Sequence, residues 1–238
     1  MALQIHPSSV WDKQVVYEDN HIIVINKFPS EIVQGDKTGD LPLSEKVKAY
    51  IKERDHKPGN VFCGVIHRLD RPVSGLVIFA KTSKALSRFN ELLREKQIGK
   101  RYLAVVKNMP EKDSGKLEHY LVKNEKTNTS KAYPKPVPGA LKAELEYEVL
   151  LSSDNYHLLK IRLLTGRHHQ IRCQLSAIGS PIKGDLKYGF ARSNPGGFIH
   201  LHSYELEFVH PIKQELVQLR SLPEGDDPVW KFFSEKLG

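Results

Sequence analysis

An alternation of apolar with mostly polar residues in the middle of the chain constrains its fold most. Every second position from 143 to 151 is apolar, beginning with Ala143 and ending with Leu151. A period of two places such residues on one face of a half-buried strand. The turn-forming residues SSDN follow at 152–155, and the apolar run 156–164 then returns. We therefore expect two neighbouring antiparallel strands in this region.

Further elements follow from the same kind of pattern. Asp19-Asn20 separates two β-rich runs within 15–27, which predicts a hairpin. Helical spacing of apolar residues predicts helices in four segments, and β-rich apolar runs predict strands in two others. The first predicted helix covers 43–54 with Ser44 as a possible N-cap, and the second covers 83–97, is capped by Ser83 and is ended by Gly99. A short helix after residue 168 is ended by Gly179, and a last helix covers 228–237. The predicted strands cover 101–107 and 199–209. Hairpins with few helices indicate an α+β fold with a mostly antiparallel sheet flanked by helices.

The chain length of 238 residues fits a single domain over 1–238. Residues 109–142 are richer in Lys, Pro, Asn and Gly than their surroundings. This segment is either a connection between two subdomains or a surface excursion that contains a short strand.

The charge balance favours a polyanionic partner. Lys and Arg number 36 against 28 Asp and Glu, which gives a net charge of +8 and a sequence pI near 9.3. No apolar run is long enough for a membrane helix, and the N-terminus lacks the apolar region of a signal peptide. The two cysteines, Cys63 and Cys173, have no spacing typical of a metal site or a disulfide framework. These features favour a cytoplasmic protein with no membrane partner.

Two segments concentrate reactive side chains. The sequence HRLDR at 67–71 places Asp70 between two arginines and a histidine, in a polar loop between apolar runs. Nearby cations favour an ionised carboxylate, which suits a nucleophile better than a general acid. The sequence TGRHHQIR at 165–172 collects further hydrogen-bond donors. The alternatives are an exposed salt-bridge cluster for the first segment and a basic helix start for the second.

The order of these segments resembles the RluA-type family of pseudouridine synthases. The segment HRLDRPVSGLVIFAKT is similar to the family's HRLD-x-x-x-SGL signature, and RYLAVV at 101–106 and TGRHHQIRCQLSAIGSPIKGD at 165–185 are similar to later family blocks. The opening YEDNHIIVINK is similar to the family's N-terminal strand pair. The resemblance extends from Val15 to Pro211. It implies the pseudouridine-synthase fold, with a catalytic cleft between two subdomains.

The resemblance also implies roles for individual residues. Asp70 matches the catalytic aspartate, Tyr102 the tyrosine held against the target base, and Arg172 the basic residue that pairs with the aspartate. The remaining matches are positions implied to bind the substrate. These are Ile171 as an apolar wall of the pocket, Arg68 as an arginine that helps to displace the flipped nucleotide, and Arg167 and His169 as RNA-contacting or structural positions. Gln174 departs from the pattern, because many relatives have a histidine there.

Isomerising uridine to pseudouridine imports no group and oxidises nothing, so we expect no cofactor and no metal. The implied partner is RNA, with a stem-loop in rRNA or tRNA as the target and no obligate protein partner. The target nucleotide must leave its stack to be reached. About fourteen residues precede the first strand, too few for the additional S4-like domain of some relatives.

Three other functions are compatible with parts of this sequence. A metal hydrolase would use the histidine pairs 168–169 and 200/202, but no acidic ligand has a characteristic spacing from them. A retaining glycosidase would need a second carboxylate opposite Asp70. A non-catalytic RNA-binding module on the same fold is the main alternative.

Overall fold

The computed structural model describes residues 11–237, and its internal contacts divide the chain into two compact units. Unit 1 runs to Ile98 and takes in Leu206–Ser221, and unit 2 comprises Gly99–Glu205 and the residues from Leu222 onward. Strand β10 (Leu201–Val209) therefore belongs to unit 2 up to Glu205 and to unit 1 thereafter. The boundary between the units does not fall in the segment 109–142, because this segment lies wholly inside unit 2.

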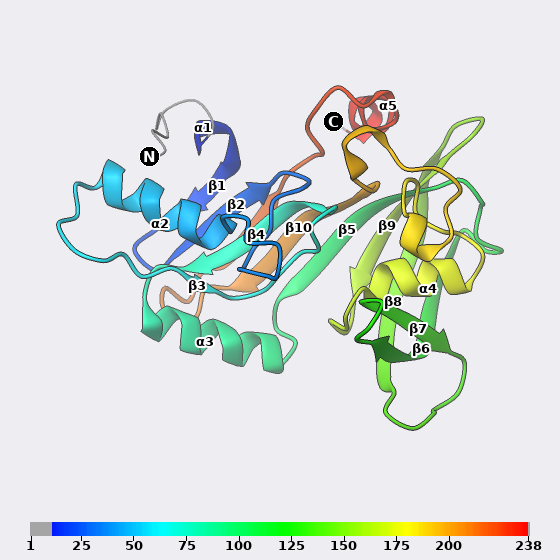
Figure 1. Ribbon diagram of the computed structural model, residues 1–238, viewed down its shortest axis with the longest axis horizontal. Coiled ribbons are helices and arrows are strands. Elements are labelled where there is room, and N and C mark those ends of the chain that lie inside the picture. The colour runs from blue at the N-terminus through cyan, green and yellow to red at the C-terminus, as the bar shows by residue number, and fades with distance from the viewer. Residues whose placement is uncertain (1–10, 238) are drawn as a thin grey trace. The chain divides into compact units, whose positions relative to one another are not determined.

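Unit 1 is built on a sheet with the strand order β1–β2–β4–β10, in which β3 also pairs with β4 and β11 with β10. The β1–β2 hairpin confirms the turn predicted at Asp19-Asn20, whose Asp19 carboxylate accepts hydrogen bonds from the backbone of residues 21 and 22. The elements of the unit are α1 (Trp11–Gln14), β1 (Val15–Glu18), β2 (Ile22–Lys27), α2 (Leu43–Arg54), β3 (Gly64–Val65), β4 (Ser74–Ala80), α3 (Ser83–Arg94) and β11 (Leu216–Arg220) (Figure 1).

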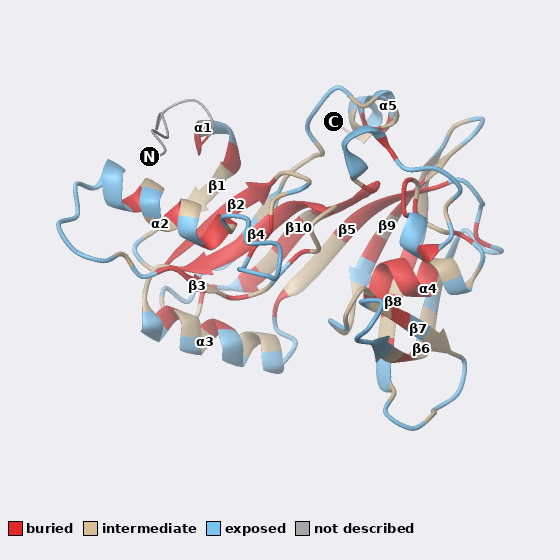
Figure 2. Cartoon of the chain, viewed as in Figure 1, coloured by how far each residue is buried: buried red, intermediate tan, exposed pale blue. Residues whose placement is uncertain are grey.

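Strands β2 and β4 are buried along their whole length (Figure 2). On one face Ile22, Val24, Leu76 and Ile78 share a core with Phe89 of α3. The intervening residues of both strands point to the opposite face and are also buried. Helix α2 buries its own apolar stripe. Its Lys46 forms an ion pair with Glu31, which lies four positions after the end of β2. Two covered faces explain why these strands read as continuous apolar runs.

The predicted bounds of α2 are confirmed, but two of the expected caps are wrong. Pro42 occupies the N-cap position of α2, and Ser44 lies buried inside its first turn. Helix α3 is capped by the Thr82 side chain, which accepts a hydrogen bond from the backbone N–H of residue 85, rather than by Ser83. Its last residue is Arg94, the left-handed position that follows is Lys96, and Gly99 already begins the next strand.

Unit 2 is built on a sheet with the order β10–β5–β9–β8–β6–β7. The strand pair predicted around the turn at 152–155 is confirmed as antiparallel β8 and β9. The segment 109–142 contains the whole antiparallel hairpin of β6 and β7. The elements are β5 (Gly99–Val106), β6 (Ser114–Asn124), β7 (Thr129–Tyr133), β8 (Leu141–Ser152), β9 (His157–Leu163), α4 (Gln170–Ala177), the short 3-10 turns η1 (Leu186–Tyr188) and η2 (Pro195–Gly197), and α5 (Pro228–Leu237).

Helix α4 lies against β6 and β7 (Figure 1) and also contacts η1. Its residues from Gln170 to Leu175 are all buried, so it forms part of the core of unit 2 (Figure 2). The terminal helix α5 starts at the predicted residue, and the Asp227 carboxylate caps it by accepting hydrogen bonds from the backbone of residues 229 and 230. The α+β class with a mostly antiparallel sheet flanked by helices is confirmed. Within residues 11–237, no helix is long and apolar enough to cross a membrane.

Candidate active site

The Asp70 loop is a tight excursion between two paired strands of unit 1. Strands β3 and β4 are antiparallel neighbours, so residues 66–73 leave the sheet and return to it. Buried Leu69 and Val73 anchor the loop on either side of Asp70, and the N–H of Val73 donates to the Asp70 carbonyl at 3.0 Å. Asp70 itself is partly buried, and Arg68 is exposed. The local sequence therefore holds one carboxylate at the rim of a rigid sheet.

The basic residues that surround Asp70 in sequence have other partners in unit 1. The guanidinium group of Arg71 forms an ion pair with Asp40 and donates to the Thr38 hydroxyl at 3.0 Å. The ring of His67 accepts a hydrogen bond from the backbone N–H of Ile78 through Nε2 at 3.2 Å, which ties the start of the loop to β4. The motif residues His67 and Arg71 thus fasten the loop at both ends.

A buried lysine that the sequence motifs did not single out lies beside the Asp70 loop in unit 1. Lys27, the last residue of β2, is 0% exposed. Its ammonium group donates to the carbonyl oxygens of Phe28 at 2.9 Å and of Arg71 at 3.2 Å. Burial lowers the pKa of Lys27 to about 7, and the negative charges of Glu31 and Asp70 oppose that shift. The available sequence signal was a lysine closing an apolar strand.

The other candidate catalytic residues lie in unit 2, where Tyr102 is a buried residue of β5. Tyr102 is paired with Ile161 of β9 in the antiparallel ladder and is 6% exposed. Ile171, the implied apolar wall, is buried at the start of α4. Both positions are held by regular structure, which restricts their side-chain freedom.

Arg172 takes part in a buried ion pair within unit 2. Its Nε donates to Asp185 Oδ2 at 2.7 Å and its Nη2 to Asp185 Oδ1 at 2.8 Å, while both side chains are at least 96% buried. The guanidinium group also lies 5.0 Å from the centre of the Tyr188 ring. A bidentate pair of this kind fixes the plane of the guanidinium group. The sequence did not identify Asp185 as this partner, and the pairing of Arg172 with Asp70 stays a prediction.

The residues that precede α4 form a network of hydrogen bonds. His169 adopts a left-handed backbone with φ of 50°, and its Nδ1 lies 2.9 Å from the Tyr188 hydroxyl. The ring of His168 stacks on that of His169, with 3.8 Å between centres. The exposed Arg167 donates from Nε to the carbonyl of Lys142 at 3.0 Å. These contacts hold Arg167 and His169 within unit 2, and the roles expected for them stay predictions.

Gln174, the departure from the family pattern, is fully buried. Its side-chain nitrogen lies 3.3 Å from the carbonyl of Leu117 and 3.2 Å from that of Ala143, which ties α4 to β6 and β8. The side chain therefore faces the interior of unit 2.

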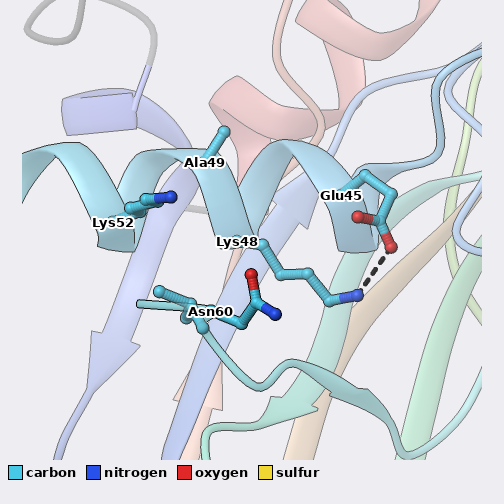
Figure 3. A pocket seen from close by; sticks show the side chains of 6 residues that line it. Glu45, Lys48, Ala49, Lys52 and Asn60 are labelled. Atoms are coloured by element: carbon cyan, nitrogen blue, oxygen red, sulfur yellow. Dashed lines mark hydrogen bonds and ion pairs between the residues drawn. The ribbon is translucent and has the colours of Figure 1, made fainter. Parts of the chain in front are cut away.

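Two surface hollows lie away from these residues. One, of about 390 Å³, lies between α2 and residues 60–61, where Lys48 forms an ion pair of 2.7 Å with Glu45 (Figure 3). The other, of about 450 Å³, is lined by charged side chains of β5, β6, β8 and β9 in unit 2. Neither includes Asp70, Tyr102 or Arg172.

The histidines that raised the possibility of a metal site have other partners. His169 contacts Tyr188, and the buried His200 lies 2.8 Å from the Asp227 carboxylate through Nε2. Across residues 11–237, no group of three or more His, Cys, Asp or Glu side chains is arranged to hold a metal ion.

Comparison with known proteins relates this arrangement to one family. Residues 21–177 match the family model described as RNA pseudouridylate synthase. Ribosomal large subunit pseudouridine synthase C of Buchnera aphidicola subsp. Acyrthosiphon pisum is 32% identical over 205 residues, 83% of this chain and 63% of that protein. The tRNA pseudouridine synthase C of Pectobacterium carotovorum subsp. carotovorum is 30% identical over 226 residues, 87% of this chain and 58% of that protein. The chain therefore spans less than two thirds of either relative.

A solved structure supports the fold. Human RNA Pseudouridylate Synthase Domain Containing 4 superposes with a TM-score of 0.76 at 20% identity, covering 95% of this chain and 94% of that one. At this identity the likeness concerns the fold alone. The match to the family model is independent of it and covers more than half of the chain. The chain belongs to the RNA pseudouridylate synthase family, as its resemblance to the RluA-type enzymes predicted.

Proposed function

We propose that this protein is an RNA pseudouridine synthase, an isomerase that converts uridine to pseudouridine in structured rRNA or tRNA, with Asp70 as its nucleophile. The observation that carries the proposal is the fixed Asp70 loop in a chain of this family. Hydrogen bonds from Lys27, Ile78 and Val73 hold the loop around a single, partly buried carboxylate. The two relatives named above are a ribosomal and a tRNA enzyme, which supports these two classes of RNA.

The proposed reaction detaches uracil at N1, rotates it and re-attaches it to the ribose through C5. The Asp70 carboxylate attacks the sugar C1′ or the uracil C6, or it removes a sugar proton, and the three routes stay open. Each requires a charged oxygen that is shielded from water, so the site needs a compensating cation. We assign that function to Arg172, whose guanidinium orientation is fixed by Asp185.

RNA binding in this proposal combines charge and stacking. The net charge of +8 favours contacts with phosphates, which determine position rather than sequence. Tyr102 offers an aromatic face to the flipped uracil, a contact worth about 1–3 kcal/mol. Arg68 is the exposed residue of the Asp70 loop and is assigned to displacement of the nucleotide. A stem-loop target and a cytoplasmic location remain part of the proposal.

The test compares the wild type with Asp70→Asn. RNA labelled with tritium at the uridine C5 releases that tritium when pseudouridine forms, so release measures turnover directly. We expect Asp70→Asn to abolish release while filter binding to the same rRNA and tRNA transcripts is retained, because shape and basic charge persist. Asp154→Asn, in the exposed turn between β8 and β9, is the matched control and should release tritium at the wild-type rate. Normal turnover by Asp70→Asn would remove the nucleophile assignment.

A second outcome distinguishes the main alternative. A non-catalytic RNA-binding module would bind the transcripts without releasing tritium even in the wild type. Tyr102→Phe refines the assignment, because it keeps the aromatic face and removes the hydroxyl group. We expect it to bind RNA normally and to release tritium more slowly if the phenol assists loss of the C5 proton. Release at the full wild-type rate would limit Tyr102 to stacking.

A further inference from the structure

Lys27 is the most deeply buried cation next to the Asp70 loop. Among the side chains of 0–1% exposure in the described chain it is the largest charged one, and it ends a strand whose first four residues are apolar. Burying an ammonium group without compensation is costly, so the groups around Lys27 must offset that cost.

The first contact is with the backbone of the loop. The carbonyl oxygen of Arg71, the residue directly after Asp70, accepts hydrogen bonds from the Lys27 ammonium at 3.2 Å and from the backbone N–H of Ser30 at 2.8 Å. The same ammonium donates to the carbonyl of Phe28 at 2.9 Å. Lys27 therefore joins the end of β2 to the peptide next to the proposed nucleophile.

The second effect is electrostatic. Around Lys27 the neighbouring charges form direct pairs, Arg71 with Asp40 and Lys46 with Glu31 at 2.9 Å. Within the described residues Lys27 makes no such direct pair, and the carboxylates of Glu31 and Asp70 are the negative charges that act on it. Glu31 is paired with Lys46, and Asp70 is the other carboxylate whose negative charge acts on Lys27.

We propose that Lys27 is a positioning residue for Asp70: its ammonium group fixes the carbonyl of the residue that follows the nucleophile and supplies positive charge that stabilises the carboxylate within unit 1. This inference rests on the proposed function. It also gives Asp70 a compensating charge from its own unit, in addition to the one assigned to Arg172.

The experiment measures the pH dependence of tritium release by the full chain. Burial places the pKa of Lys27 at about 7, so the wild type should lose activity as the pH rises through this value. Lys27→Arg keeps its charge, and its activity should not fall in that range. Lys27→Met should lower kcat by roughly 10- to 100-fold, as a displaced reactive group does, with KM within about twofold of the wild type. Lys84→Met, an exposed lysine of α3, is the control and should match the wild type.

A purely structural lysine would give a different result. Lys27→Met would then have reduced thermal stability with an unchanged kcat, or a reduced kcat with the wild-type pH profile, and either outcome overturns the proposal. If Lys27→Met does not fold, Glu31→Gln decides. Removing the Glu31 charge lowers the pKa of Lys27, so the alkaline loss of activity must move to lower pH. An unmoved profile refutes the inference. An inactive wild type refutes the proposed function instead, so the two failures are distinguishable.

Discussion

The buried pair of Arg172 and Asp185 provides the sharpest test of how unit 2 is held together. Replacing Asp185 by Asn keeps the size of the side chain and removes its charge. The Arg172 guanidinium then loses two short hydrogen bonds to a carboxylate while it remains 4% exposed. Breaking a buried ion pair by removing one partner costs about 3–5 kcal/mol. The nearby ring of Tyr188 persists in the variant, which favours the lower end of this range.

This cost translates into a measurable change in melting temperature. A chain of this length changes its Tm by roughly 2 °C per kcal/mol, so Asp185→Asn should melt about 6–10 °C below the wild type. Differential scanning calorimetry and urea unfolding followed by circular dichroism measure the change. Asp226→Asn is the matched control, because the Asp226 carboxylate is 99% exposed and its pair with Lys231 is screened by solvent. It should melt like the wild type.

A double variant separates charge from packing. If an unbalanced buried charge causes the loss, the variant Arg172→Met with Asp185→Leu should be more stable than Asp185→Asn, because both charges are removed together. An Asp185→Asn protein that melts like Asp226→Asn would refute the reasoning. It would show that the guanidinium group of Arg172 does not depend on this carboxylate.

Three further predictions concern other parts of the fold. Gly184→Ala should lower the urea midpoint by an amount equal to roughly 1–3 kcal/mol, because residue 184 has φ of +87° and a Cβ would lie 2.9 Å from the carbonyl oxygen of Phe198. Phe89→Ala should lower the free energy of unfolding by about 3–5 kcal/mol in the same assay, since this ring is 0% exposed and packs edge-on against Phe208. A smaller loss would mean that the core of unit 1 can collapse around the cavity. Burial raises the pKa of Asp227, but hydrogen bonds from His200 and the backbone of residue 230 outweigh it and hold that pKa at about 2. The stability that this carboxylate contributes is complete above its ordinary pKa of 3.8 and is lost as the pH falls toward 2. Thermal melts of Asp227→Asn across this interval should therefore depend less on pH than those of the wild type, and equal slopes would contradict the assignment.

Local patterns predicted the elements well where one face of a segment is buried. The bounds of α2 and α5 and the β8–β9 pair all follow from apolar spacing. The caps were less accessible, because Thr82 and Ser83 are both good N-cap residues and only the geometry of the chain selects Thr82. Similarly, the left-handed turn after α3 uses Lys96, although Gly99 is the residue that intrinsic preference favours.

The candidate site divides in the same way. Asp70 stands in a motif and was identified from sequence, and its role remains a prediction. Lys27 and Asp185 could not be found in this way, because their partners are defined by tertiary structure. Lys27 contacts the carbonyl of a residue 44 positions away, and Asp185 reaches Arg172 across the turn that follows α4. No local periodicity encodes such a contact.

The shared strand β10 has a consequence for synthesis of the protein. Unit 1 needs the segment from Leu206 to Ser221 to complete its sheet, although most of its residues lie before residue 99. A nascent chain that has been synthesised only as far as Ile98 would expose the edge of β4 and the apolar face of α3, both of which are buried in the complete protein. Domains generally fold as units during translation, so this one must wait for the last quarter of the polypeptide. An amino-terminal fragment is consequently an aggregation hazard rather than an independent folding module.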